Sequence, residues 1–186
     1  MRRVAVLDHG MGNLRSVAKA LEAAGADVTV TAAASEIENS DALCVPGQGI
    51  FGRCVQNLAD SGTGDVIASW IAEDRPFLGI CLGMQILFER SDENDAKGLG
   101  LFAGEVRRLP PILTVPHIGW NEVDGTHYYF DHSYAVHPAD ETIVAGWCEH
   151  GERFAAVVKS RSVFAVQFHP EKSGAAGIDL LKDWLR

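Results

Sequence analysis

The stretch FLGICLGMQ, residues 77–85, decides the fold, because it joins an apolar run to a cysteine held between two glycines. Residues 79–83 have the form G-x-nucleophile-x-G, which is typical of a sharp turn from a buried strand into a helix. The neighbours must be small because the central residue adopts a strained backbone conformation that lifts its side chain clear of the sheet. We therefore predict a strand over 77–80, a helix over 82–89 and a reactive thiol at Cys81, favoured as thiolate by the positive end of that helix.

A buried structural cysteine is the alternative, since free cysteine is among the most buried residue types. A partner base is needed to decide, and FAVQFHPE at 164–171 supplies one: a strand-forming run ends at His169, which Pro170 biases toward extended geometry. In an extended segment His169 and Glu171 point to the same side, so the carboxylate can orient the imidazole. We predict that Cys81, His169 and Glu171 are nucleophile, base and orienting acid, the alternative for His169 being an ordinary surface histidine.

Acyl-transfer chemistry also requires hydrogen-bond donors for the oxyanion. The backbone N–H of Leu82, the residue after the nucleophile, is one candidate. The second is expected from the glycine-dense loop in VPGQGIFG, residues 45–52, and we assign it to the backbone of Gln48 and Gly49. Taken alone this loop is weak evidence, because Pro-Gly and Gly-x-Gly also occur in ordinary turns.

The wider pattern predicts an α/β fold of the flavodoxin-like type, an open twisted sheet with a parallel core and helices on both faces. Short apolar strands alternate with helical stretches through the first half of the chain, and a short connection is expected over 31–40. Later segments are dense in strand formers and predict a mixed or antiparallel extension, followed by a last helix that carries Ile178, Leu181 and Leu185. The predicted strands are 2–8, 26–30, 41–47, 77–80, 100–109, 126–136, 142–148, 154–159 and 163–168, and the other predicted helices are 14–21, 53–60 and 64–74.

Composition excludes several classes of protein. A chain of 186 residues suits one domain over 1–186, and a net charge of −9 argues against nucleic acid as a partner. No segment approaches the roughly 18 apolar residues that a membrane helix needs. The four cysteines lack C-x-x-C spacing and the seven histidines lack H-x-x-x-H spacing. We therefore expect a cytoplasmic protein with reduced cysteines, no metal and no cofactor.

Three motifs, GICLGMQ around Cys81, PGQG at 46–49 and HPE at 169–171, make the chain similar to the class I, triad-type glutamine amidotransferases. The resemblance extends over nearly the whole chain and, within that family, to the glutaminase subunits of imidazole glycerol phosphate synthases. The further matching motifs are GMGNLRSV (10–17), PHIGWN (116–121), HSY (132–134) and QFHPEKSG (167–174). It implies that Cys81 attacks the side-chain amide of glutamine, giving a thioester and then glutamate. The ammonia would pass through a tunnel to a (β/α)₈ cyclase subunit, the partner in a heterodimer of histidine biosynthesis.

The resemblance also implies roles for residues that local patterns leave as ordinary polar or surface groups. The implied substrate-binding residues are Gly47, Gln85, Glu93, His132, Ser133 and Tyr134, and the implied partner-interface residues are Asn13, Trp120 and Lys172. From local pattern alone, Gln85 and Glu93 are solvated helix-end groups and HSY is a sheet edge. In the same way Asn13 is a helix cap, Trp120 a core residue despite its loop-like context, and Lys172 a surface charge.

Two positions depart from the family pattern. His9 stands where the family usually has tyrosine, and Gln48 replaces a residue that is commonly small and apolar. Because a backbone N–H serves the oxyanion, Gln48 is expected to change how its loop packs and not to abolish the chemistry. Two other functions stay open on sequence: a glutaminase of another synthase, of the anthranilate or pyridoxal phosphate type, and a thiol-bearing binding or sensor protein on the same scaffold.

Overall fold

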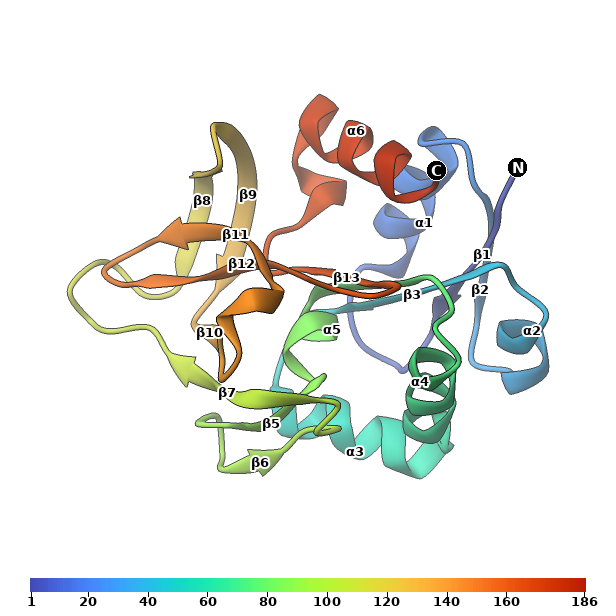
Figure 1. Ribbon diagram of the computed structural model, residues 1–186, viewed down its shortest axis with the longest axis horizontal. Helices are drawn as coiled ribbons and strands as arrows, with labels where there is room; N and C mark the ends of the chain where they lie inside the picture. The colour runs from blue at the N-terminus through green and yellow to red at the C-terminus, as the bar shows by residue number, and fades with distance from the viewer.

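The sheet at the centre of the molecule confirms the predicted α/β fold; a computed structural model describes all 186 residues (Figure 1). Its eleven strands include a parallel core that runs in the order β2-β1-β3-β4-β13. These strands span Asp27–Thr31 (β2), Arg3–Leu7 (β1), Ala42–Gly47 (β3), Phe77–Cys81 (β4) and Val163–Val166 (β13). The sequences of β3 and β4 are apolar throughout because helices cover both faces of the sheet there.

The predicted extension of the sheet continues from β13 through mainly antiparallel strands. Its path runs through β12 (Arg153–Ser160), β10 (Tyr134–Pro138), β7 (Phe102–Arg108), β5 (Phe88–Ser91) and β6 (Ala96–Lys97), and β11 (Val144–Glu149) pairs with β12. A separate two-stranded hairpin is formed by β8 (His117–Val123) and β9 (Thr126–His132). Only β5 and β7 pair in parallel within this half.

Helices lie on both faces of the parallel core, and each face has its own hydrophobic cluster (Figure 1). The helices α1 (Leu14–Ala23) and α6 (Gly174–Trp184) cover one face, where Leu21 and Leu181 are buried. On the other face lie α3 (Phe51–Ser61) and α4 (Thr63–Ala72), with Leu58 and Trp70 buried. The shorter helices are α2 (Ala34–Glu38), α5 (Leu82–Gln85), η1 (Glu141–Ile143) and η2 (Pro170–Lys172). None of the helices has the length and apolar character that crossing a membrane requires.

The prediction was wrong in four places. The segment 82–89 is not one helix, because α5 ends at Gln85 and β5 begins at Phe88. Every residue from 82 to 88 is buried, so the sequence has no alternation of apolar and polar residues from which the change from helix to strand could be predicted. Residues 31–40 contain α2, which buries Ile37. The predicted strand 126–136 is divided at Ser133 between two sheets, and the context of Trp120 is the unpredicted strand β8.

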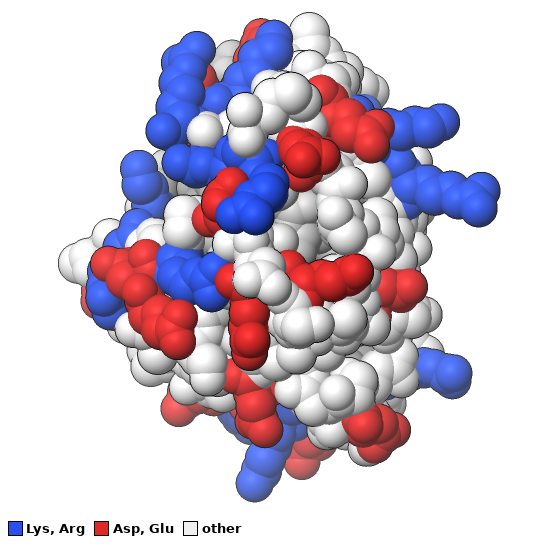
Figure 2. Space-filling model, turned by 90° about the vertical axis from the view of Figure 1, so that its right-hand side faces the viewer, with Lys and Arg blue, Asp and Glu red and all other residues white.

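Surface charge is mixed on the side of the molecule at the β2 edge, where lysine and arginine side chains are interspersed with acidic ones (Figure 2). Ion pairs at the surface of the chain include Arg3 with Asp41 at 2.8 Å and Arg161 with Asp74 at 3.2 Å. A duplex-binding surface needs a continuous basic stripe, which this face does not present.

Candidate active site

Cys81 is the last residue of β4, and the chain turns there directly into α5. Its backbone has φ +53° and ψ −107°, a conformation that costs a non-glycine residue roughly 1–3 kcal/mol. The turn is tight because its two flanking glycines leave room for backbone: a Cβ on Gly83 would overlap the Val45 carbonyl oxygen, and one on Gly79 would lie 2.7 Å from the Gly83 carbonyl oxygen. The spacing of glycines in GICLG is thus required by close backbone contact.

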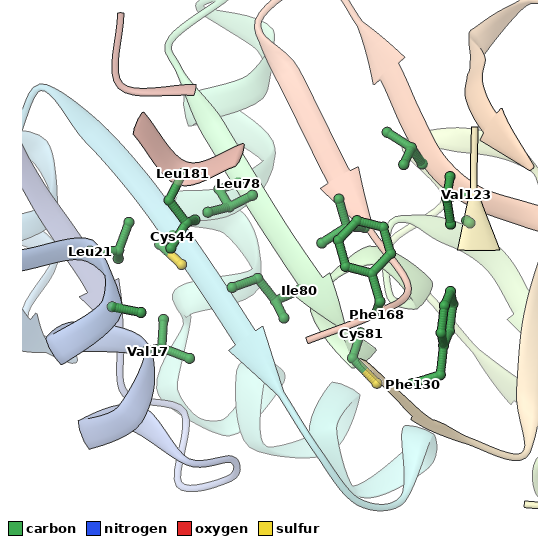
Figure 3. Close-up of a cluster of buried hydrophobic side chains, with 14 of the residues drawn as sticks. Val17, Leu21, Cys44, Leu78, Ile80, Cys81, Val123, Phe130, Phe168 and Leu181 are labelled. Carbon is green, nitrogen blue, oxygen red and sulfur yellow. The ribbon is translucent and has the colours of Figure 1, made fainter. Parts of the chain in front are cut away.

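The four cysteines occupy different environments, which Figure 3 shows for two of them. Cys81 lies at the end of β4 with 5% of its surface exposed, whereas Cys44 lies deep beside Leu21 and Leu181 and is fully buried. Burial raises the thiol pKa of Cys44, and it raises those of Cys54 and Cys148 to about 12. These three thiols therefore stay protonated and unreactive at neutral pH.

His169 and Glu171 form a buried pair next to this turn. His169 Nδ1 lies 2.7 Å from Glu171 Oε1, and both side chains are almost inaccessible to solvent. The pair meets Cys81 because β13 lies beside β4 in parallel, with Val166 opposite Ile80. The residues that follow each strand therefore leave the sheet at the same edge, although they are almost ninety positions apart.

The imidazole of His169 is held in its cationic form. Burial by itself would lower its pKa, but the nearby Cys81 sulfur and the Glu171 carboxylate offset that effect and raise the pKa to about 10. The Nε2 atom of His169 is buried without a hydrogen-bond partner inside the chain, as is Oε2 of Glu171. An imidazole with Nδ1 fixed by a carboxylate and Nε2 left free can move a proton between a thiol and a leaving group.

A buried amide network extends from Cys81 and contains a residue that the sequence analysis missed. Gln167 donates from Nε2 to Cys81 Sγ at 3.4 Å, and its Oε1 accepts from Gln85 Nε2 at 2.9 Å. Gln85 also donates to the Tyr134 carbonyl oxygen at 3.0 Å, so it is neither solvated nor at the surface. Gln167 directly follows β13 at the sheet edge where β4 ends in Cys81, and its place two residues before His169 is the signal that could have found it.

The loop after β3 begins beside the nucleophile. Gly47 pairs with Cys81 across the two strands, and a Cβ on Gly47 would lie 2.7 Å from Leu82 Cβ. No backbone N–H of Gln48, Gly49 or residue 50 donates to another backbone group, so the donors of this loop remain free. Glu93 lies where the loop enters α3: its Oε2 accepts from the backbone N–H of Phe51 at 2.7 Å.

The HSY segment joins β9 to β10, and several of its polar groups are hydrogen-bonded within the chain. Both ring nitrogens of His132 are already engaged, Nδ1 with the Tyr134 carbonyl oxygen at 2.8 Å and Nε2 with His117 Nδ1 at 2.9 Å. The Ser133 carbonyl accepts from Leu109. Burial lowers the pKa of His132 to about 3, so its ring is neutral. The backbone carbonyl of Tyr134 is the link between this segment and the Gln85–Gln167 network.

The three residues assigned to a partner interface lie at the surface. Asn13 caps α1 by accepting from the Ser16 N–H at 3.4 Å. Trp120 is 57% exposed on β8 and is not a core residue, and its ring packs edge-on against Tyr129, with 6.0 Å between ring centroids. Lys172 lies over the same tyrosine ring, with Nζ 5.7 Å from the centroid. No group of three or more histidine, cysteine or acidic side chains is placed to hold a metal ion.

Comparison with known proteins gives a consistent result. The family described as "Glutamine amidotransferase class-I" matches residues 5–186. The chain is 45% identical to "Imidazole glycerol phosphate synthase subunit HisH" of Dechloromonas aromatica, covering 98% of this chain and 95% of that protein. It is 43% identical to the protein of the same name from Aquifex aeolicus, covering 99% and 96%.

Among solved structures, the fold is similar to that of a crystal structure of a glutamine amidotransferase, with a TM-score of 0.79 and 23% identity over 98% of this chain and 96% of the other. PurLQS from Thermotoga maritima gives a TM-score of 0.75 with 17% identity and full coverage of both chains. At these identities the structures show the shared fold alone. The motifs, the match to the family model and the relatives matched over nearly their full length agree. The chain belongs to the class-I glutamine amidotransferase family.

Proposed function

We propose that this chain is the glutaminase subunit of an imidazole glycerol phosphate synthase and that it hydrolyses glutamine to glutamate and ammonia. The observation that carries the proposal is the strained turn at Cys81 beside the His169–Glu171 pair, in a chain 45% identical to a named subunit of that synthase. A histidine whose pKa is raised to about 10 keeps a cation next to the sulfur, which favours the nucleophilic thiolate.

The reaction follows from these atoms. Cys81 Sγ attacks the side-chain amide carbon of glutamine, and the C=O electron pair moves to the oxygen, where the backbone N–H groups of Leu82 and of Gln48 or Gly49 stabilise it. His169 then transfers a proton to the amide nitrogen, the C–N bond breaks and ammonia leaves a thioester on Cys81. Water attacks the thioester, giving its proton to His169, and the C–S bond breaks to release glutamate. Glu171 holds the imidazole in the required orientation.

Substrate recognition is assigned to groups around this turn. Gln85 ends α5, and the carboxylate of Glu93 binds the Phe51 N–H where the loop after β3 enters α3; both side chains are held by hydrogen bonds within the chain. In this proposal Glu93 contacts the substrate's amino group, and Gly47 and the segment 132–134 complete the binding site. Opposite charge makes a carboxylate suitable for that contact.

We assign the partner-facing surface to Asn13, Trp120 and Lys172, and the partner to a (β/α)₈ cyclase subunit that receives the ammonia. A tryptophan exposed at 57% is unusual on a free surface, and Ile118 on the same strand is exposed to the same degree. Exposed aromatic and aliphatic side chains of this kind are typical of interface centres. The proposal includes a single domain over 1–186 and a cytoplasmic location.

The test is glutamate formation by the purified complex of this chain with its cyclase. Replacing Cys81 by alanine is expected to lower kcat by at least about 10⁴-fold, as loss of the nucleophile does in triad enzymes. A glutamine analogue with an electrophile at the amide position should add to Cys81 in the native chain, as detected by mass spectrometry. Substantial hydrolysis by the alanine variant, or no adduct at Cys81, would refute the proposal. The chain alone should turn over glutamine only weakly, and full activity without the cyclase would argue against partner-completed chemistry.

A further inference from the structure

The loop formed by Pro46, Gly47, Gln48 and Gly49, here the oxyanion loop, begins with the last two residues of β3 and has little backbone support beyond them. Gln48 and Gly49 are exposed, and their N–H groups have no backbone acceptor. Gly49 has φ +123°, a conformation that glycine adopts readily and other residues rarely do. A loop that must present fixed donors to an oxyanion therefore depends on side chains from elsewhere to hold it in place.

His9 holds the loop from the inside. It follows β1, it is 4% exposed, and its Nε2 lies 2.6 Å from the Pro46 carbonyl oxygen. Because a carbonyl can only accept, Nε2 carries the proton and Nδ1 is the acceptor for the Cys54 thiol, 3.7 Å away. The pKa of that thiol is raised to about 12 by burial, so the S–H is retained. Asn57 in α3 fixes the backbone of His9 by donating to its carbonyl at 2.9 Å.

Gln48 holds the same loop from the outside. Its Nε2 donates to Asp131 Oδ2 at 3.0 Å, and that oxygen also accepts from Lys172 Nζ at 3.1 Å. Asp131 belongs to β9, and Lys172 directly follows Glu171 in η2. The outer contact thus connects the oxyanion loop to the segment that carries His169 and Glu171. The loop is therefore hydrogen-bonded on its buried side by His9 and on its exposed side through the side chain of Gln48.

We propose that His9 and Gln48 are positioning residues for glutamine hydrolysis, which together fix the oxyanion loop relative to Cys81 and His169. The expected effect on catalysis rests on the proposed function. The effect of His9 and Gln48 on the position of the loop does not depend on it. A loop freed from either side presents its N–H groups less accurately to the developing charge, which slows the chemical step without weakening glutamine binding.

The kinetic test uses the complex with the cyclase. His9→Phe keeps the ring and removes the donor, His9→Gln restores a donor, and Gln48→Leu removes the outer amide. We expect His9→Phe and Gln48→Leu each to lower kcat by about 10-fold and to change KM by no more than about twofold. This loss of kcat is smaller than the roughly 10²–10³-fold loss that follows removal of an oxyanion donor itself. His9→Gln should recover most of that loss. The matched control is Gln56→Leu, which breaks the similar contact of Gln56 with Asp60 at 2.7 Å on the exposed face of α3.

The second measurement is independent of glutaminase activity: ¹⁵N order parameters for the amides of Gly47, Gln48 and Gly49 in the full chain. We expect a fall from rigid values near 0.85 toward 0.6 in His9→Phe and Gln48→Leu, and no change in Gln56→Leu. Unchanged order parameters in both variants overturn the inference, whatever the activity, as does a His9→Gln variant as impaired as His9→Phe. If the wild-type complex hydrolyses no glutamine while the order parameters fall, the proposed function is wrong and the positioning of the loop stands.

Discussion

Two cysteine–histidine pairs lie in this molecule, and only one has the features of a nucleophile with its base. Cys81 stands at a strained strand-to-helix turn beside His169, and Glu171 binds the other ring nitrogen of that histidine at 2.7 Å. Cys54 lies within α3, fully buried, and faces His9, whose other ring nitrogen donates to a carbonyl. Proximity of thiol and imidazole is therefore not sufficient.

The third partner decides the charge state of each pair. A carboxylate on the histidine stabilises imidazolium, and with the sulfur it raises the pKa of His169 to about 10. The partner of His9 is an uncharged carbonyl oxygen, which accepts a hydrogen bond from the ring, and burial raises the thiol pKa of Cys54 to about 12. Only the first pair therefore has a negative charge on its third partner.

Among the tests of this comparison, removing the charge of that third partner should have the largest effect on kcat. We expect Glu171→Gln to lower kcat by about 10³-fold, since an amide keeps the shape but loses the charge that stabilises imidazolium. The measurement is steady-state glutamate formation by the complex with the cyclase. The control is Glu152→Gln, whose carboxylate lies 3.4 Å from His137 Nε2 outside the site and which should stay within about threefold. Equal losses in the two variants would contradict the assignment.

Alkylation distinguishes the two thiols directly. Iodoacetamide at neutral pH should modify Cys81 about 100-fold faster than Cys54, because Cys54 is protonated inside α3 while Cys81 stands at the turn after β4 and faces the His169 cation. Peptide mass spectrometry after timed quenching gives both rates in one sample. Cys148, whose thiol pKa is also raised to about 12, provides a second slow reference. Comparable rates at Cys81 and Cys54 would remove the distinction.

The two cysteines also differ in backbone conformation, because Cys81 lies at a strained turn and Cys54 lies within the helix α3. Gly83→Ala places a methyl group against the Val45 carbonyl oxygen and should lower the free energy of unfolding by about 1–3 kcal/mol. Gly64→Ala in α4 meets only ordinary contacts of 3.5 Å or more and should be neutral or slightly stabilising. Urea unfolding of both variants tests this, and an equally stable Gly83→Ala variant would show that the turn tolerates a side chain.

The last difference is a dependence of stability on pH. The pKa of His169 is about 10 in the folded chain against an ordinary value of 6.5, so between these values the folded state binds the extra proton. The stabilisation is complete below pH 6.5 and is lost as pH rises through 10. The free energy of unfolding of the wild type minus that of His169→Gln should therefore shrink from pH 7 to pH 10. A difference that grows with pH would mean that His169 is neutral in the fold.

Local sequence predicted much of this arrangement. The steric demand for small neighbours at a sharp turn is contained in GICLG, and the HPE motif predicted the contact between His169 and Glu171. The predicted extended geometry was wrong, because Glu171 lies in the 3-10 helix η2. The alternation of strands and helices predicted the parallel core, which the structure confirms. These features depend on residues close together in the chain, where geometry leaves few alternatives.

Other features could not be predicted because they depend on contacts between distant segments. The end of the helix at Gln85 is set by the pairing of β5 with β7, while the residues themselves are uniformly buried and carry no period. The role of Gln167 in the network around Cys81 and the position of Glu93 at the start of α3 depend on residues 42 to 86 positions away.

By itself, the sequence determined that a thiol stands at a tight turn and that an imidazole is followed two residues later by a carboxylate. Only the tertiary structure decided that the two segments meet, because β13 enters the sheet beside β4 and not beside another strand. Strand order is the reason for this division: a turn is determined by sterics within a few residues, whereas the neighbour of a strand is chosen by the packing of the whole sheet.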